Sequence, residues 1–247
     1  MIQVACGLGT NSAAMLIGLH ERGITPDVIL FADTGGERPD TYDFGYNLNT
    51  WCESHGFPSI VTVSSKTTLE EDCLTRKALP SIAYGFKSCS QRWKGQRQDK
   101  YMNNWPPAKE YWKAGGKITK YIGFDADEPQ RARDFEDKKY RVEYPLIDWG
   151  WGRDECVEAI SRSGLPQPGK SSCFFCPSMK PTEIRSLAAT NPELIERALA
   201  IEENADLTSI SGLGRNWAWK DLLATDDMFG DDSYIQTMSI DCGCYDG

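Results

Sequence analysis

The sequence predicts an α/β fold with an open parallel sheet, helices on both faces and a helical C-terminal extension. Three observations support this prediction: short apolar runs of strand length, apolar residues that recur at helical spacing between them, and a glycine-containing loop after the first run. The chain has 247 residues and 40% hydrophobic content, which is enough for a large buried core.

The order of the elements indicates a strand–loop–helix–strand unit at the start of the chain. The expected elements are a strand over 2–6, a helix over 12–22, a strand over 27–32, a helix over 39–55, and strands over 59–63 and 117–123. Between the last two strands, a long polar region contains cysteine and aromatic residues instead of Gly/Ser filler, so we expect it to flank an active site. The extension is expected over 181–203 and 214–219.

The charge balance argues against a general affinity for nucleic acid. Lys and Arg total 27 against 36 Asp and Glu, which gives a formal charge of −9. A local basic segment lies over residues 87–100, where Arg92, Lys94 and Arg97 accompany Trp93; a solvated helix face explains it equally well.

The cysteine count and the length of the apolar runs predict the cellular compartment of the protein. Nine cysteines are an odd number, and the N-terminus has no basic segment before its apolar run, so neither a disulfide framework nor a secretory signal is expected. No apolar run approaches the roughly 20 residues that cross a bilayer. We therefore expect a cytoplasmic protein without a membrane partner.

The loop Gly7-Leu8-Gly9-Thr10-Asn11-Ser12 follows the first strand, where doubly wound sheets bind phosphate groups. Its glycines allow amides to approach phosphate oxygens, the helix start adds a positive end, and Thr10 and Ser12 add hydroxyls. A P-loop NTPase is disfavoured because the Gly-Lys-Ser/Thr ending is absent. A dinucleotide-binding fold fits Gly7-x-Gly9 and a ribose-binding carboxylate at Asp33, but its third glycine position is Ser12. A tight turn without a ligand stays an alternative.

Two cysteines at C-x-x-C spacing, Cys173 and Cys176, precede Pro177. Such a turn places both sulfurs on one side of a loop, where they can bind one metal centre. Tetrahedral zinc and iron–sulfur clusters both need more ligands, so the others must come from elsewhere in the chain.

Six segments occur in an order that is more specific than any one of them. They are Val4-Ala5-Cys6-Gly7-Leu8-Gly9-Thr10-Asn11-Ser12, Phe31-Ala32-Asp33-Thr34-Gly35, Cys89-Ser90-Gln91-Arg92-Trp93-Lys94, Ile122-Gly123-Phe124-Asp125-Ala126-Asp127-Glu128, Tyr144-Pro145-Leu146-Ile147-Asp148-Trp149 and Cys173-x-x-Cys176-Pro177. Together they resemble the phosphoadenylyl-sulfate (PAPS) reductase family, which belongs to the adenine-nucleotide α-hydrolase or PP-loop ATP pyrophosphatase group. The resemblance implies an adenine-nucleotide-binding domain over 1–190, which includes the cysteine site, and a helical extension with a cysteine-containing tail over 191–247.

The loop departs from the family pattern at three positions. ATP-using members read Ser-Gly-Gly-x-Asp-Ser, which aligns with Gly7 to Ser12. Asn11 replaces an Asp that would help to hold magnesium. Nucleotide binding is therefore a firmer expectation than pyrophosphatase activity. Whether magnesium is a cofactor stays an open question.

The resemblance also implies where the nucleotide lies. It would cross the carboxyl edge of the sheet, with Phe31, Asp33 and Thr34 at the adenine and ribose and Gly123 close to the nucleotide. Arg131 and Arg133 are the nearby cations suited to phosphate or sulfate. Ion pairs with the surrounding acids are the alternative, and they are favoured for Arg133.

The resemblance suggests a metal set of Cys89, Cys156, Cys173 and Cys176, since Cys89 lies on the family-like Cys-x-x-Arg-x-Lys segment and the others form C-x16-C-x2-C. Relatives hold a [4Fe–4S] cluster with such cysteines, and zinc is the alternative. Cys156 opens an expected helix, where it could instead be a small buried apolar residue. Without it, the cluster would have three protein ligands and an open iron that could carry sulfur.

The tail, Asp241-Cys242-Gly243-Cys244, is similar to the mobile Glu-Cys-Gly tail of the reductases. The similarity makes Cys242 a candidate nucleophile and Cys244 its resolving partner, while an inert or metal-binding tail is the favoured alternative. The chain has only two histidines, His20 and His55, so histidine acid/base chemistry is not expected.

These observations favour an enzyme that activates a substrate with ATP, releases pyrophosphate and serves sulfur transfer. The alternatives are a sulfonucleotide reductase that uses Cys242, or a nucleotide-binding module without catalysis. The expected partners are an adenine nucleotide and an acceptor of nucleobase or nucleic-acid type. Whether two copies of the chain form a homodimer stays an open question.

Overall fold

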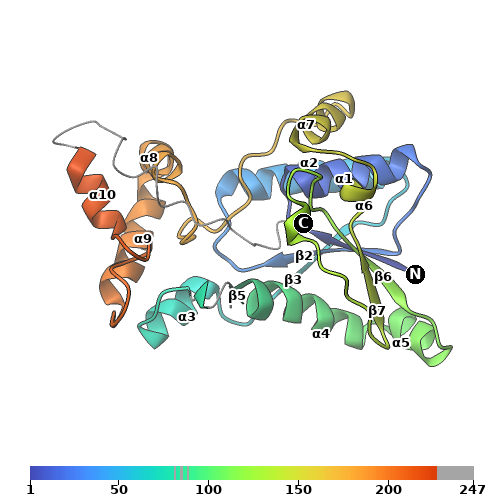
Figure 1. Ribbon diagram of the computed structural model, residues 1–247, viewed down its shortest axis with the longest axis horizontal. Helices are drawn as coiled ribbons and strands as arrows, with labels where there is room; N and C mark the ends of the chain where they lie inside the picture. Colours follow the sequence, from blue (N-terminus) through green and yellow to red (C-terminus); the bar gives the residue numbers. More distant parts are fainter. Residues whose placement is uncertain (81, 84–85, 88, 227–247) are drawn as a thin grey trace.

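A computed structural model describes residues 1–80, 82–83, 86–87 and 89–226 (Figure 1). Its main sheet has five strands in the order β3-β2-β1-β6-β7, and every pairing is parallel. The strands are β1 (Ile2–Cys6), β2 (Val28–Asp33), β3 (Ile60–Ser64), β6 (Ile118–Ile122) and β7 (Tyr140–Glu143). A separate antiparallel pair joins β4 (Ile82–Ala83) to β5 (Phe86–Lys87). The predicted fold class is therefore confirmed.

The strand order reverses at β1. The chain first builds outward through β2 and β3, and then returns to the other side of β1 with β6 and β7. Open α/β sheets bind ligands in the crevice at the carboxyl ends of the strands beside such a reversal. The loop after β1 and the loop after β6 border this crevice.

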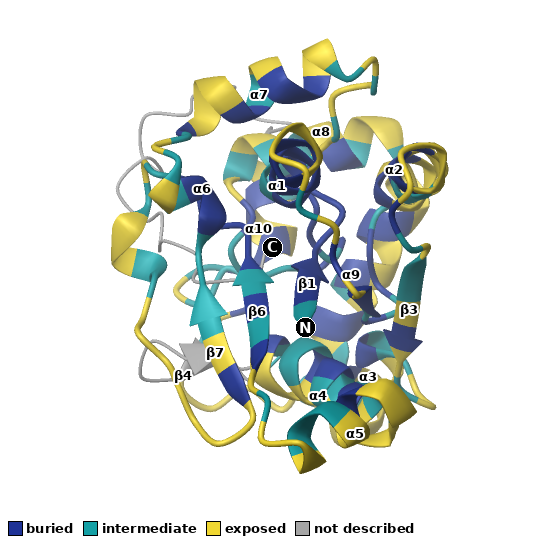
Figure 2. Cartoon of the chain, turned by 90° about the vertical axis from the view of Figure 1, so that its right-hand side faces the viewer, coloured by how far each residue is buried: buried dark blue, intermediate teal, exposed yellow. Residues whose placement is uncertain are grey.

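Helices cover both faces of the sheet (Figures 1 and 2). One face carries α1 (Thr10–Glu21), α2 (Pro39–Ser54), α6 (Pro145–Asp148) and α7 (Arg153–Arg162). The opposite side carries α3 (Leu69–Arg76), the π-helix η1 (Ser90–Gly95), α4 (Gln96–Asn104) and α5 (Pro106–Lys113). The C-terminal helices α8 (Pro181–Thr190), α9 (Pro192–Asn204) and α10 (Trp219–Asp226) lie beyond one side of the sheet. A short 3₁₀ helix, η2 (Pro129–Arg131), follows β6.

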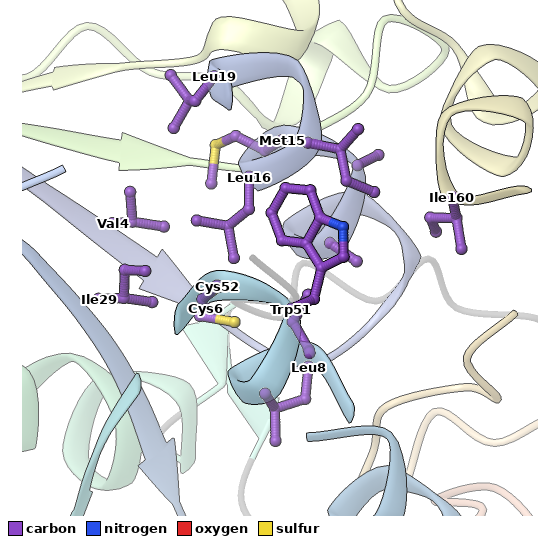
Figure 3. Packing of buried hydrophobic residues seen from close by; sticks show 14 of the residues in the cluster. Val4, Cys6, Leu8, Met15, Leu16, Leu19, Ile29, Trp51, Cys52 and Ile160 are labelled. Carbon is purple, nitrogen blue, oxygen red and sulfur yellow. The ribbon is translucent and has the colours of Figure 1, made fainter. Parts of the chain in front are cut away.

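Three large buried clusters hold these layers together, and a small fourth one joins Ala5 to Ile122 and Phe124. In the first, Met15 and Leu16 of α1 and Trp51 of α2 pack on the sheet (Figure 3). The second joins the C-x-x-C loop, through Phe174 and Phe175, to α3 and the C-terminal helices. The third packs α4 and α5 beneath the sheet. Strands β1 and β2 are buried almost throughout because both faces are covered.

The six elements that the sequence predicted between residues 2 and 123 lie within two residues of their observed bounds. The helices α3, α4 and α5, inside the long polar region, were not predicted. Strand β7 was not predicted. The expected helix over 181–203 is two helices, since Asn191 ends α8 and Pro192 begins α9. Residues 214–218 are not helical, because Arg215 has a left-handed backbone and α10 begins only at Trp219.

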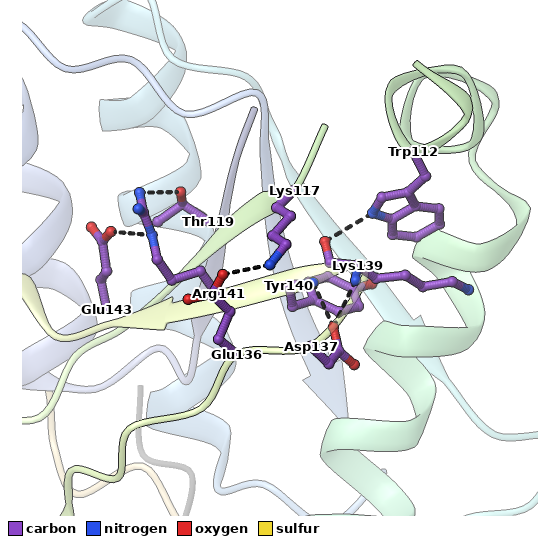
Figure 4. Close-up of polar contacts among 9 residues, drawn as sticks. All are labelled: Trp112, Lys117, Thr119, Glu136, Asp137, Lys139, Tyr140, Arg141 and Glu143. Atoms are coloured by element: carbon purple, nitrogen blue, oxygen red, sulfur yellow. Dashed lines mark hydrogen bonds and ion pairs between the residues drawn. The ribbon is translucent and has the colours of Figure 1, made fainter. Parts of the chain in front are cut away.

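Polar contacts hold β7 at the edge of the sheet (Figure 4). Asp137 Oδ1 accepts hydrogen bonds from the amides of Lys139 and Tyr140, each at 2.7 Å. Arg141 on β7 forms an ion pair with Glu143 at 2.7 Å. Charged side chains of this kind are typical of edge strands, and they hide the apolar alternation by which a strand is predicted.

Among the described residues, no helix is long and apolar enough to span a membrane. Cys242 and Cys244, the candidate tail nucleophile and its partner, lie outside the described residues.

Candidate functional site

The loop between β1 and α1 is held in shape by its own side chains. Leu8 has a left-handed backbone with φ of 58°, and its side chain is buried and contacts Gly45. The Gly9 amide donates to Ser12 Oγ at 3.2 Å, and the Ser12 hydroxyl donates to the Gly9 carbonyl at 3.1 Å. The Ser12 hydroxyl therefore orders the loop, and its predicted bond to phosphate stays a prediction. The amides of the first turn of α1 have no acceptor within the helix and mark a position for an anion.

The end of β6 lies directly against this loop. A Cβ at Gly123 would lie 3.0 Å from the carbonyl oxygen of Asn11 and 3.1 Å from its carbonyl carbon. Glycine at this position thus allows two backbones to approach each other, while its expected approach to a nucleotide stays a prediction. Two residues further, Asp125 Oδ2 accepts a hydrogen bond of 3.0 Å from Asn11 Nδ2. The loops after β1 and β6 are therefore linked by a side-chain bond.

The end of β2 supplies two polar side chains. Asp33 Oδ1 accepts hydrogen bonds from the Gly35 amide at 2.7 Å and from the Tyr42 hydroxyl at 2.9 Å. Thr34 Oγ1 lies 3.0 Å from Cys173 Sγ. Phe31, which we expected beside the adenine, is only 3% exposed and packs in the first buried cluster. Thr34 is also buried, at 2% exposure, so Asp33 is the partly exposed member of this segment.

The C-x-x-C loop crosses the same edge. Cys173 forms an antiparallel bridge with Glu37, and the Phe174 amide donates to the Gly36 carbonyl at 2.8 Å. Just before it, the side chain of Ser171 lies so close to Gly9 that a Cβ on Gly9 would collide with Ser171 Oγ. The cysteine loop is thus packed on the glycine loop, although the two are far apart in the sequence.

A buried ion pair lies beside Cys173. Glu37 is only 4% exposed, and Lys94 Nζ on η1 lies 3.5 Å from its Oε1. Burial, followed by the negative charge of Glu37, raises the pKa of Cys173 well above its ordinary value, while Lys94 and the Thr34 hydroxyl oppose this shift. Cys173 is therefore a neutral thiol in this state, and binding to a metal would require loss of its proton. π-Helices such as η1 are frequent at functional sites.

The structure separates the four predicted metal ligands into two groups. Cys89, Cys173 and Cys176 pack against the second buried cluster, and the Cys176 amide donates to the Cys173 carbonyl at 3.0 Å. Cys156 is fully buried in the first cluster, on α7 where that helix packs against α1. This burial agrees with its alternative as a small apolar residue, and its role as a ligand stays a prediction.

The same separation affects whether the four cysteines could bind an iron–sulfur cluster or a zinc ion together. Within the described part of the chain, no group of three or more His, Cys, Asp or Glu side chains is arranged to hold a metal ion. The donors Cys89, Cys173 and Cys176 have suitable chemistry, but with Cys156 in another layer the four-cysteine set does not fit a preformed centre. Cys73, which no motif singled out, lies near enough to Cys89 for the two thiols to interact electrostatically.

The two candidate arginines have protein partners. The Arg131 guanidinium lies over the Phe124 ring at 4.2 Å and forms an ion pair with Glu128. Ion pairing, which the sequence favoured for Arg133, is thus observed for Arg131, and its catalytic role stays a prediction. The backbone of Arg133 exchanges two hydrogen bonds with the Tyr144 hydroxyl, at 3.0 and 2.9 Å.

Sequence reasoning missed four residues of this edge: Glu37, Lys94, Asp125 and Ser171. Asp125 and Lys94 belong to segments that carry the family resemblance, but the sequence did not single out either of them as a site residue. The signal for Ser171 was present, since Ser171 and Ser172 directly precede the C-x-x-C motif. Ser172 Oγ is buried and has no hydrogen-bond partner within the described residues.

Comparisons with known proteins give two similar structures. No family model matches the sequence, and no curated protein matches it. The phosphate complex of PAPS reductase from Candida auris is 15% identical, with a TM-score of 0.40, over 68% of this chain and 74% of that chain. The U34-tRNA thiolase NcsA from Methanococcus maripaludis, with its [4Fe-4S] cluster, is 14% identical, with a TM-score of 0.46, over 99% of this chain and 79% of that chain. The fold is the one expected from the resemblance to PAPS reductases: an open parallel sheet with helices on both faces, as the strand pairings of this chain establish.

Proposed function

We propose that this chain is an adenine-nucleotide-binding enzyme of the PAPS reductase family that activates an acceptor with ATP and releases pyrophosphate. One observation carries the proposal: the cysteine loop is packed on the glycine loop, with Ser171 against Gly9 and Cys173 against Thr34. The proposed phosphate site and a pair of cysteines thus share one edge of the sheet. Such an arrangement suits chemistry in which sulfur is delivered to a nucleotide-activated acceptor.

The residues of the edge have distinct parts in this proposal. Amides of the loop Gly7–Ser12 and of the first turn of α1 bind the phosphates of ATP. An acceptor oxygen attacks the α-phosphorus, a new P–O bond forms, and the bond to the bridging oxygen breaks so that pyrophosphate leaves with both electrons of that bond. The acceptor is then adenylylated and ready for attack by sulfur.

An iron–sulfur cluster is part of the sequence prediction, and a bound cluster would supply or carry sulfur. Because the described residues do not assemble a metal set, we assign no step to the cluster. The cysteines of the edge, Cys89, Cys173 and Cys176, are the ligands we propose for any metal that binds. Cys156 is not included.

Calorimetry with ATP, adenylyl sulfate and NAD tests the proposal. Wild-type protein should bind ATP, and Gly9→Asp should abolish binding through steric blockage and charge repulsion. Asn47→Asp adds the same charge on an exposed position of α2 and should bind like the wild type. Each variant is checked by thermal unfolding.

The other nucleotides distinguish the alternatives. Binding of adenylyl sulfate but not ATP, followed by a cysteine S-sulfo adduct in mass spectrometry, would make the chain a reductase. Tight NAD binding would favour the dinucleotide interpretation. ATP binding without pyrophosphate release in the presence of candidate nucleobase acceptors would favour a binding module.

A further inference from the structure

The two helical layers of the protein carry charges of opposite sign. On one face of the sheet, residues 89–117, which form η1, α4 and α5, contain seven Lys or Arg and two Asp or Glu. On the other face, residues 10–55, which include α1 and α2, contain two Lys or Arg and seven Asp or Glu. Figure 1 shows these layers on opposite sides of the sheet. The negative formal charge of the chain is therefore distributed unevenly, and one side of the molecule is basic.

Several lysines on the basic side have no counter-charge. Lys109 and Lys113 are exposed and lie one turn apart on α5, so they share one side of that helix. Lys139, just before β7, donates to Asn103 Oδ1 on α4 at 2.6 Å and lies 4.6 Å from the centre of the Trp112 ring on α5 (Figure 4). In the part of the chain that the structure describes, five exposed lysines of this region form no ion pair with a carboxylate: Lys100, Lys109, Lys113, Lys138 and Lys139. We call these five lysines the basic face.

The acids of this region do not neutralise the basic face. Asp99 on α4 forms an ion pair with the buried Lys120 at 3.5 Å, and Glu136 forms one with Lys117. Two further acids remain: the exposed Glu110 on α5 and the aspartate before β7 that accepts hydrogen bonds from two amides. Five lysines against these two acids leave three positive charges in excess.

Aromatic side chains lie among these lysines. Tyr101, Trp105 and Trp112 are half-buried and pack against the third buried cluster. The rings of Tyr101 and Trp105 are stacked, with their centres 6.4 Å apart. Single-stranded nucleic acid is bound by surfaces of this composition, because cations contact the phosphates and aromatic rings stack on the bases. An acidic protein would require the charges but not the rings.

We propose that the basic face is the surface through which this chain binds a single strand of nucleic acid. The phosphates contact the lysines of α4, of α5 and of the segment before β7. The acidic layer that contains α1 and α2 repels phosphates, so the strand binds to one side of the molecule only. The basic layer begins at η1, where Lys94 lies beside the cysteine loop. A strand that follows α4, which is about 14 Å long, therefore leads towards the candidate site.

The test is fluorescence anisotropy with a labelled oligouridylate of about 20 nucleotides in the absence of ATP. For single strands, the logarithm of the affinity falls with the logarithm of the salt concentration, with a slope of about −0.7 for each phosphate contacted. Five contacts predict that wild-type affinity falls by roughly 100-fold between about 50 and about 200 mM salt. In the triple variant Lys100→Gln/Lys109→Gln/Lys113→Gln, two contacts remain, and the fall should be only roughly 10-fold.

A second triple variant, Lys77→Gln/Lys180→Gln/Lys220→Gln, makes the same change of charge at exposed positions outside the basic face and should bind like the wild type. Thermal unfolding checks that both variants are folded. Equal weakening in the two variants, or no binding at low salt, would overturn the proposal. Displacement of the strand by polyglutamate as effectively as by unlabelled oligouridylate would assign the face to an acidic protein and would also overturn it. Because ATP is absent, each of these outcomes leaves the proposed function untouched.

Discussion

The substitution Gly9→Ala examines whether the cysteine loop is packed on the glycine loop. Gly9 has φ of −105° and ψ of −176°, a conformation that alanine adopts without strain. By itself, the change should therefore stabilise the protein by about 0.4–1 kcal/mol through the unfolded state. However, the added Cβ would collide with Ser171 Oγ and lie 3.3 Å from Ser171 Cβ. Ser171 is 7% exposed, so its side chain has little room to move.

We expect Gly9→Ala to lower the free energy of unfolding by about 1–3 kcal/mol, the usual effect of overpacking. Chemical denaturation of the single variants and of Gly9→Ala/Ser171→Gly measures the coupling between the two sites. In the Ser171→Gly background the alanine should be neutral or stabilising, which changes the sign of its effect. Additive free energies within about 0.5 kcal/mol would show that the two loops are not in contact, and would refute the arrangement on which the proposed function depends.

The remaining predictions concern the thiols and the buried ion pair. If anaerobically prepared protein contains iron or zinc, Cys173→Ser and Cys176→Ser should each remove it, while Cys156→Ser should retain it; metal loss in all three would place Cys156 in the site. Lys94→Met should destabilise the protein by about 3–5 kcal/mol in denaturation experiments, because Glu37 keeps a buried charge, and adding Glu37→Gln should restore most of this loss unless the pair is unimportant. Burial raises the pKa of Cys156 from 9.0 to about 12, so the folded state keeps its proton longer than the unfolded state. Stability should fall as pH rises from 9 towards 12, by up to about 1.4 kcal/mol per pH unit, and Cys156→Ala should lose that component in a pH series of unfolding curves.

The sequence was sufficient to predict those strands, helices and loops that are specified by a pattern of neighbouring residues. The apolar run Ile2–Cys6 was predicted with its observed bounds, and the glycine loop was correctly placed between β1 and α1. Strand β7 was not predicted, because this edge strand contains Arg141 and Glu143 and therefore has no clear alternation of apolar and polar residues. The break at Asn191 was signalled by Pro192, but the apolar pattern on both sides conceals it.

The site depends on contacts between distant segments, which spacing along the chain cannot reveal. The cysteines were grouped by C-x16-C-x2-C, but Cys156 is buried in the first cluster while Cys173 lies beside Thr34, just after β2. The role of Ser12 was also ambiguous, because a hydroxyl in a glycine loop can bind a ligand or order the loop. Its bonds to Gly9 show that it orders the loop, and phosphate binding stays a prediction.

The most direct measurement of the central claim is amide hydrogen exchange with and without saturating ATP and Mg²⁺. If the phosphates bind where the two loops meet, peptides that contain residues 7–12 and 171–176 should both gain protection, while peptides from the exposed face of α2 should not change. Protection of the first segment alone would separate the cysteine loop from the nucleotide site. No protection in either segment, at an ATP concentration shown to saturate the protein, would contradict the account.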